Sequence, residues 1–125
     1  MDKNVIKIYT SSSDWARTMV FYKSSVFTGT MLEIPLAVNK EKGIFITVKF
    51  SKLKDSAGSS SIYIRKIEQD PDTASFMKET TKSITFLADP VKHRDGFEIL
   101  IMENAGLIRK ALRELSGEEE WEIKF

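Results

Sequence analysis

The sequence has no cysteine, one histidine and few glycines and prolines, and it contains no long apolar run. The missing cysteines exclude disulfides, thiolate zinc sites and cysteine nucleophiles, and they suit a reducing compartment. No apolar stretch approaches the ~20 residues that span a bilayer, and the N-terminal letters MDKNVIKIY lack the apolar core of a signal peptide. We therefore expect a cytoplasmic protein that does not bind membranes.

Motifs for catalysis or cofactor binding are equally scarce. The one histidine, His93, has no cysteine or second histidine with which to build a metal site or a nucleophilic triad. The letters His93-Arg94-Asp95 match part of a kinase catalytic loop, but no glycine-rich phosphate loop accompanies them. The acidic clusters at 70–72 and 118–120 lack the alternating oxygen ligands of a calcium loop. The sequence thus predicts no enzyme, metal or cofactor; an enzyme acting through scattered Asp, Glu or Tyr is the least favoured alternative.

The composition favours one globular domain whose charges are segregated along the chain. A length of 125 residues with 42% hydrophobic and 30% charged residues fits a single domain over 1–125. The net charge is +1, yet residues 1–66 hold eleven basic and five acidic residues, and residues 67–125 hold eight and thirteen. Such segregation indicates a basic surface for a polyanion, or two protomers docking basic half to acidic half, unless the charges simply coat solvated faces unevenly.

Alternating apolar and polar residues predict about seven or eight strands. The clearest is residues 43–51, GIFITVKFS, in which every even position is apolar. Pro35 lacks a backbone donor, which places it at a sheet edge or a bulge. Residues 97–102 are expected to pair as a strand with 82–88 across the polar loop 89–96. We expect the other strands at 5–9, 11–29, 31–38 and 61–67, with a turn at 39–43, a loop at 54–60 and one or two helical turns within 68–80.

One helix is expected near the C-terminus. Asn104 precedes it as a cap, Gly117 supplies its stop, and between them Ala105, Ile108, Ala111, Leu112 and Leu115 recur on one face. In the last residues, EEEWEIKF, apolar and polar residues alternate, so 117–125 is either a final strand or a short acidic tail. This order of elements predicts an α+β domain of mainly antiparallel strands, closed as a small barrel or a strongly curved sheet with one C-terminal helix.

The non-core side of the predicted strands combines aromatic rings with cations. The combination occurs three times, as Lys7 with Tyr9, Phe45 with Lys49, and Tyr63 with Arg65. If these strands are adjacent and in register, the rings can stack bases at about 1–3 kcal/mol each while the cations neutralise phosphates. Lysines in the following loop would close over the bound strand. The predicted contacts are Tyr9, Phe45 and Tyr63 for bases and Lys7, Lys49, Lys52, Lys54 and Arg65 for phosphates, while Ile108, Leu112 and Leu115 pack the helix.

The C-terminal sequence SGEEEWEIKF, with three glutamates before Trp121 and a terminal Phe125, resembles the acidic, aromatic-ended tails of bacterial and phage single-stranded DNA-binding proteins. That resemblance implies an OB-like (oligonucleotide-binding) barrel, and a tail that recruits replication and recombination proteins and competes with DNA for the basic groove. Ile123 and Lys124 depart from the pattern by diluting the acidity, and no long Gly, Pro or Gln linker precedes the tail. The order of strands followed by a helix also resembles the coactivator and Whirly-type single-strand binders. In these a curved antiparallel sheet carries DNA and the helix mediates oligomerisation.

These observations lead to one hypothesis and one main alternative. The hypothesis is a homo-oligomer that binds single-stranded DNA in replication, recombination or transcription with little sequence preference, with RNA left open, and that recruits partner proteins through Trp121 to Phe125. The alternative is a protein-protein interaction or assembly module without nucleic-acid binding. In that case Phe45 and Tyr63 pack under a helix or in a subunit interface, and the neighbouring cations only extend to water.

Overall fold

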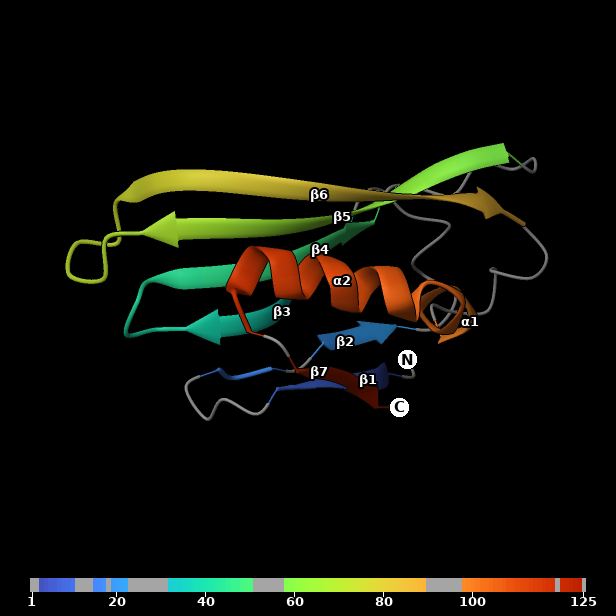
Figure 1. The fold of residues 1–125 in the computed structure, drawn as a ribbon, viewed down its shortest axis with the longest axis horizontal. Coiled ribbons are helices and arrows are strands. Elements are labelled where there is room, and N and C mark those ends of the chain that lie inside the picture. Colours follow the sequence, from blue (N-terminus) through green and yellow to red (C-terminus); the bar gives the residue numbers. More distant parts are fainter. Residues whose placement is uncertain are drawn as a thin grey trace.

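The computed structural model describes residues 3–10, 15–17, 19–22, 32–50, 58–89, 98–118 and 120–124. It shows an α+β chain of mainly antiparallel strands in two sheets, with two helices (Figure 1). No helix in this part of the chain is both long and apolar enough to cross a membrane. The elements are β1 (Lys3–Thr10), β2 (Met19–Tyr22), β3 (Leu32–Asn39), β4 (Ile44–Phe50), β5 (Gly58–Gln69), β6 (Phe76–Ala88), α1 (Glu98–Glu103), α2 (Ala105–Ser116) and β7 (Trp121–Lys124).

The larger sheet has four strands in the order β3-β4-β5-β6, so each strand pairs with its neighbour in sequence. Its period-two pattern buries Ile46 and Val48 of β4 and Ile62 and Ile64 of β5 on one face. Pro35 lies on the edge strand β3, where a register shift separates it from Ala37, so both of its expected placements hold.

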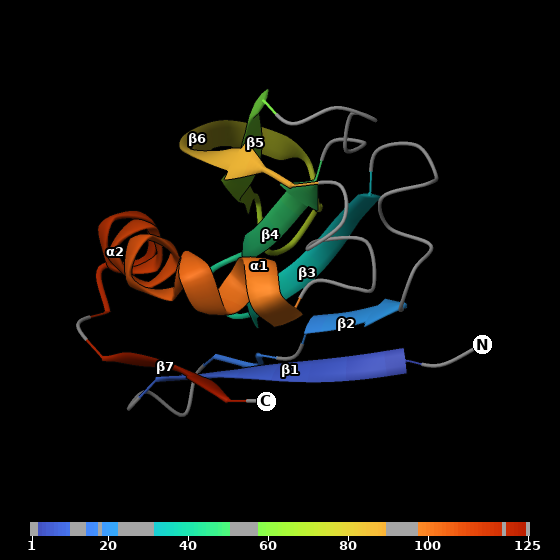
Figure 2. The ribbon, with the colours of Figure 1, turned by 90° about the vertical axis from the view of Figure 1, so that its right-hand side faces the viewer.

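The smaller sheet has three strands in the order β2-β1-β7. The first half of β1 pairs with β2 and the second half with β7. The two sheets are joined at Ala16 and Val38, whose backbone groups exchange hydrogen bonds of 3.0 and 2.8 Å. Figure 2 shows the smaller sheet below the larger one, with both helices beside them. The core fills the space between these elements.

Helix α2 follows the predicted pattern closely. Its apolar stripe is buried, and Gly117 ends it in the left-handed conformation at φ 77°, with its N–H donating to the carbonyl of Arg113 at 3.0 Å. Asn104 occupies the position before the helix but makes no side-chain cap, and its Nδ2 donates to the carbonyl of Leu100 in the preceding helix at 2.9 Å. The expected capping by the Asn104 side chain is therefore wrong.

The expected strand at 97–102 is also wrong, since residues 98–103 form helix α1. Leu100 and Ile101 are both buried while Ile99 and Met102 are exposed. Adjacent residues on one face fit a helix, because neighbours in a strand point to opposite faces. The strand β6 therefore has no partner from this segment.

Residues 70–75 connect β5 and β6 as a hairpin turn, so the helical turns expected within 68–80 are wrong. The Asp70 carboxylate accepts hydrogen bonds from the backbone N–H groups of Asp72 and Thr73 at 2.9 and 3.1 Å, which closes a tight turn at 71–73. With the turn this short, β5 runs to Gln69 and β6 begins at Phe76.

Two other segments differ from the sequence-based expectation, and the C-terminal segment adopts one of its two expected forms, the strand. The long strand expected at 11–29 is broken, because Ala16 pairs with β3 whereas 19–22 pair with β1; residues 11–14, 18 and 23–29 lie outside the described part. Of the loop expected at 54–60, residues 58–60 belong to β5 and 54–57 are not described. At the C-terminus, residues 121–124 form a strand, in which Trp121 is buried and packs edge-to-face on Trp15 at 5.9 Å between ring centroids. Phe125 is outside the described residues.

Candidate nucleic-acid interface

The face of the larger sheet opposite its buried isoleucines carries four of the eight predicted contacts. Lys49 of β4 stands directly opposite Tyr63 of β5, and the register then places Thr47 opposite Arg65. Residues opposite each other in an antiparallel pair share one face. The side chains of both pairs, Lys49 with Tyr63 and Thr47 with Arg65, are half-buried. We call this surface, with Phe45, the outer face.

Phe45 lies at the apolar end of the outer face. In register it stands between Val38 of β3 and Ile67 of β5, both of which are also half-buried. Cross-strand neighbours lie about 4.5–5.5 Å apart at Cβ, so these aliphatic side chains cover part of the ring. This explains how a phenylalanine stands beside threonine and lysine on a side that is not the core.

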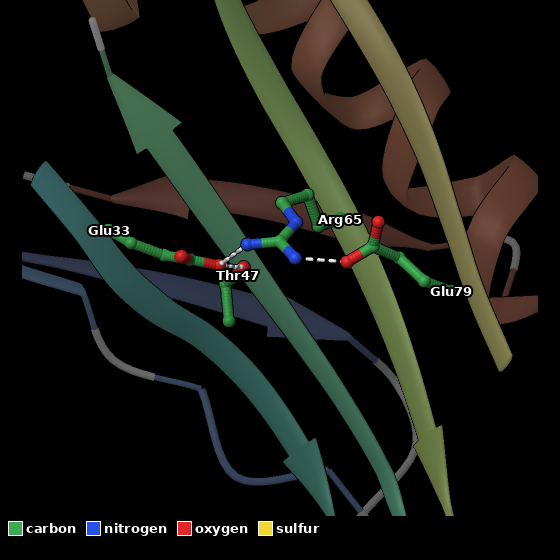
Figure 3. A network of polar contacts seen from close by, with 4 residues as sticks. All are labelled: Glu33, Thr47, Arg65 and Glu79. Atoms are coloured by element: carbon green, nitrogen blue, oxygen red, sulfur yellow. Dashed lines mark hydrogen bonds and ion pairs between the residues drawn. The ribbon is translucent and has the colours of Figure 1, made fainter. Parts of the chain in front are cut away.

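Arg65 is the centre of an ion-pair network that crosses the sheet (Figure 3). Its Nη1 donates to Glu33 Oε1 of β3 at 2.5 Å, and its Nη2 donates to Glu79 Oε1 of β6. Thr47 Oγ1 donates to the same Glu33 oxygen at 2.7 Å. The hydrogen bond to Glu79 is the main cause that raises the pKa of Arg65, and the charge of Glu33 adds to it while partial burial opposes it. The guanidinium is thus charged but already held by two carboxylates.

A hollow of about 210 Å³ lies on the outer face beside this network. Its lining includes Lys49, Tyr63, Arg65 and Glu79. Within the described part of the chain, Lys49 makes no ion pair, unlike Arg65. Lys49 is therefore the cation of this face that an anionic ligand can reach without displacing a carboxylate.

The structure separates Lys7 and Tyr9 from the other predicted contacts. Both lie on β1 of the smaller sheet, opposite Lys124 and Glu122 of β7. Lys7 is exposed and 36% of Tyr9 is exposed, while Ile8 between them is fully buried. The expectation of one platform shared by three strands is wrong for β1, because β1 pairs with β2 and β7 whereas β4 pairs with β3 and β5. Lys52 and Lys54 lie outside the described residues.

A second concave surface lies between α2 and the smaller sheet, with a volume of about 580 Å³. We call it the helix groove. It is lined by residues of β1, α2 and β7, among them Tyr9, Gly106, Arg109, Arg113 and Glu122, and by Glu120 just before β7. The sequence places Arg109 and Arg113 on the polar side of the helix, and their four-residue spacing is the only signal that they act together. Which strands lie beneath them depends on tertiary packing.

The described residues contain no group of three or more His, Cys, Asp or Glu side chains arranged to hold a metal ion. The one histidine, His93, is not among them. Comparison of the chain with protein-family models, with curated proteins and with solved structures finds no match.

Proposed function

We propose that this chain binds single-stranded DNA with little dependence on base sequence, through the outer face around Lys49 and Tyr63. The observation that carries the proposal is the direct pairing of these two residues across β4 and β5, beside a hollow that both of them line. A base stacked on the ring would gain about 1–3 kcal/mol, and the ammonium group would neutralise a neighbouring phosphate.

Phe45 offers a second stacking position on the same face. It lies four residues from Lys49 on β4, and Lys49 pairs with Tyr63. Along the strands, the two rings are therefore roughly 14 Å apart at about 3.4 Å per residue. Two ring positions separated in this way suit an extended strand with unpaired bases. Duplex DNA hides the faces of its bases, so a surface that uses ring stacking favours single strands.

In this proposal some cations bind phosphate, and Arg65 instead stabilises the outer face. Arg65 is held by Glu33 and Glu79, so a phosphate would have to compete with two carboxylates for it. We therefore assign it the role of fixing the outer face rather than of binding phosphate. Lys52 and Lys54 follow β4 in sequence and remain proposed phosphate contacts, together with Lys49.

The proposal also concerns the shape of the sheet, the compartment and the partner proteins. Of the two expected closures, an OB-like barrel or a curved sheet, we favour the curved sheet, because β6 has β5 as its only partner among the described strands. The protein would act in the cytoplasm without a cofactor, protecting unpaired DNA during replication, recombination or transcription. Recruitment of other proteins through Trp121 to Phe125 would require exposure of that segment, and Trp121 is buried in β7.

The test is the affinity for labelled oligo-dT of variants on the outer face. Tyr63→Ala and Lys49→Ala should each weaken binding several-fold while the thermal unfolding midpoint stays close to that of the wild type. Lys110→Ala is the matched control, because Lys110 is an exposed cation of α2, on the other side of the larger sheet. Equal affinities for the wild type and both outer-face variants would refute the proposal.

A specific observation favours the assembly alternative, namely the edge of β6. This strand is 13 residues long and carries exposed apolar side chains: Phe76 and Met77 are each 66% exposed and Leu87 is 79% exposed. A long open edge with exposed apolar side chains is a template for pairing with another chain. The occupant would be a second copy, with the two β6 strands antiparallel across a twofold axis.

One register of this β6 pair avoids like charges. With Thr81 opposite its own copy, Lys78 would face Ile84, Glu79 would face Ser83 and Lys82 would face Thr80. Thr81→Lys would then set two lysines against each other, whereas the control Ser83→Lys would set each lysine against a glutamate. Molar mass in solution should fall to that of a monomer for Thr81→Lys alone. A monomeric wild type at all concentrations would refute this assembly mode.

A further inference from the structure

The helix groove contains two guanidinium groups without an ion-pair partner in the described part of the chain. Arg109 and Arg113 are four residues apart on α2, so their Cβ atoms lie about 5–6 Å apart on one side of the helix. Neither arginine makes an ion pair or a side-chain hydrogen bond with another described residue. Arginine binds phosphate oxygens in a bidentate manner, and two adjacent arginines can hold one phosphate from two sides.

The charges around the groove limit what it can take. Two acidic residues also line it. Glu122 is paired with Lys124 at 3.4 Å, whereas Glu120 makes no ion pair with a described residue. Counting Lys124, three cations stand against two carboxylates, a surplus of one positive charge. A ligand group with one negative charge balances this surplus, whereas a terminal phosphate with two charges would overshoot it. A phosphodiester carries one negative charge.

The remaining lining residues provide a flat surface and open space. Tyr9 is 36% exposed and lines the groove from strand β1, whereas the arginines line it from α2. At Gly106 an added Cβ would meet no heavy atom within 4 Å, so this helix position opens freely into the groove. A volume of about 580 Å³ falls in the range of small-molecule sites. These features suit an aromatic base attached to the phosphodiester.

We propose that the helix groove binds one nucleotide unit, with its phosphodiester on Arg109 and Arg113 and its base against Tyr9. The site is separate from the outer face, because α2 packs on the side of the larger sheet that carries Ile84, opposite to Tyr63. The inference rests on the proposed function only in taking a nucleotide as the ligand. The unit could belong to a free dinucleotide or to a longer single strand, since both present the same phosphodiester and base.

The probes are the dinucleotide d(TpT), which has one phosphodiester, thymidine, which has none, and oligo-dT. Binding of each to the full chain is measured by titration calorimetry and by chemical-shift changes at the groove. The test variants are the double substitution Arg109→Gln with Arg113→Gln, and Gly106→Met, which fills the groove from an open position with a better helix former. Lys110→Gln is the control, because it removes one cation from the same helix outside the groove.

We expect the double variant and Gly106→Met each to lower the d(TpT) affinity at least tenfold. Lys110→Gln should leave that affinity unchanged, and the wild type should not bind thymidine. If only oligo-dT binds and loses affinity in the two groove variants, the unit is recognised within a strand, which also supports the site. Unchanged affinity of both probes in folded groove variants, or no binding of either probe by the wild type, would overturn it. The outer-face variant Tyr63→Ala should leave d(TpT) binding intact, so this inference and the proposed function can fail separately.

Discussion

Lys49 of β4 faces Tyr63 of β5 across an antiparallel pair, on the side of the sheet opposite to the buried Ile62 and Ile64. The next pair along, Thr47 and Arg65, is tied to Glu33 and Glu79. The first pair thus offers a ring and an ammonium group that has no ion pair with a described residue, whereas the guanidinium of the second pair is neutralised by two carboxylates of the protein. This difference between neighbouring cations separates the predictions for Lys49 from those for Arg65.

Replacing Lys49 by glutamine should reduce the salt dependence of DNA binding. Each phosphate contact on a single strand contributes about −0.7 to the slope of log affinity against log salt concentration. The variant should therefore show a slope shallower by about 0.7 in fluorescence anisotropy titrations. A slope equal to that of the wild type would mean that Lys49 does not contact phosphate.

Replacing Arg65 by alanine should act on stability rather than on binding. The side chain of Arg65 is 21% exposed, and those of Glu33 and Glu79 are 34% and 37% exposed, so solvent screens the network. We expect the free energy of unfolding to fall by about 1 kcal/mol, measured by urea denaturation. The salt slope of DNA binding should not change. A shallower slope would instead make Arg65 a phosphate contact.

Gly43 should not tolerate a side chain. Its φ is 67°, and a Cβ there would lie 2.2 Å from the carbonyl oxygen of Gln69. The backbone N–H of Gln69 also donates to the carbonyl of Gly43 at 2.8 Å, which holds the two residues close together. Gly43→Ala should therefore lower the free energy of unfolding by about 1–3 kcal/mol or more. Gly58→Ala is the control, because an added Cβ there meets nothing within 4 Å. Equal stability of the two variants in urea denaturation would contradict the geometry of this turn.

The β5-β6 turn should respond to acid through Asp70. Its pKa is lowered because its carboxylate accepts the backbone N–H of Asp72 and then that of Thr73, with burial opposing slightly. A folded pKa below the unfolded value means that this contribution to stability is complete above about pH 4 and is lost as the pH falls through the folded pKa. The amide shifts of Asp72 and Thr73 should follow that titration. Asp70→Asn should abolish it, and a midpoint at the ordinary aspartate value would contradict the prediction.

The sequence predicts this fold well where one periodicity dominates. Strand β4 and helix α2 have clear patterns, and the structure agrees with both. Ile46 is buried as the alternation in β4 predicts, and Gly117 ends α2 in the left-handed conformation. Segments without one dominant periodicity are predicted less well. Residues 97–102 resemble a strand because four apolar residues follow one another at 99–102, of which Leu100 and Ile101 are buried and Ile99 and Met102 are exposed. Tertiary packing decides which face of a segment is buried, and the local sequence alone does not specify that packing.

The candidate site is predictable to the same limited degree. The pairing of Lys49 with Tyr63 follows from two alternating strands that are neighbours in sequence. The separation of Tyr9 from them does not, because β1 pairs with the distant C-terminal strand β7. The ion pairs of Arg65 with Glu33 and Glu79 likewise depend on the relative register of β3, β5 and β6. Long-range pairing therefore decides which predicted contacts stand together.

Titration of labelled oligo-dT with the wild-type protein between about 50 and 200 mM salt tests whether the chain binds single-stranded DNA through several phosphate contacts. Contacts from Lys49, Lys52 and Lys54 should give a slope of log affinity against log salt of about −2, with binding of duplex DNA of the same length much weaker. Absence of binding at the lowest salt, or equal affinity for the duplex, would contradict it.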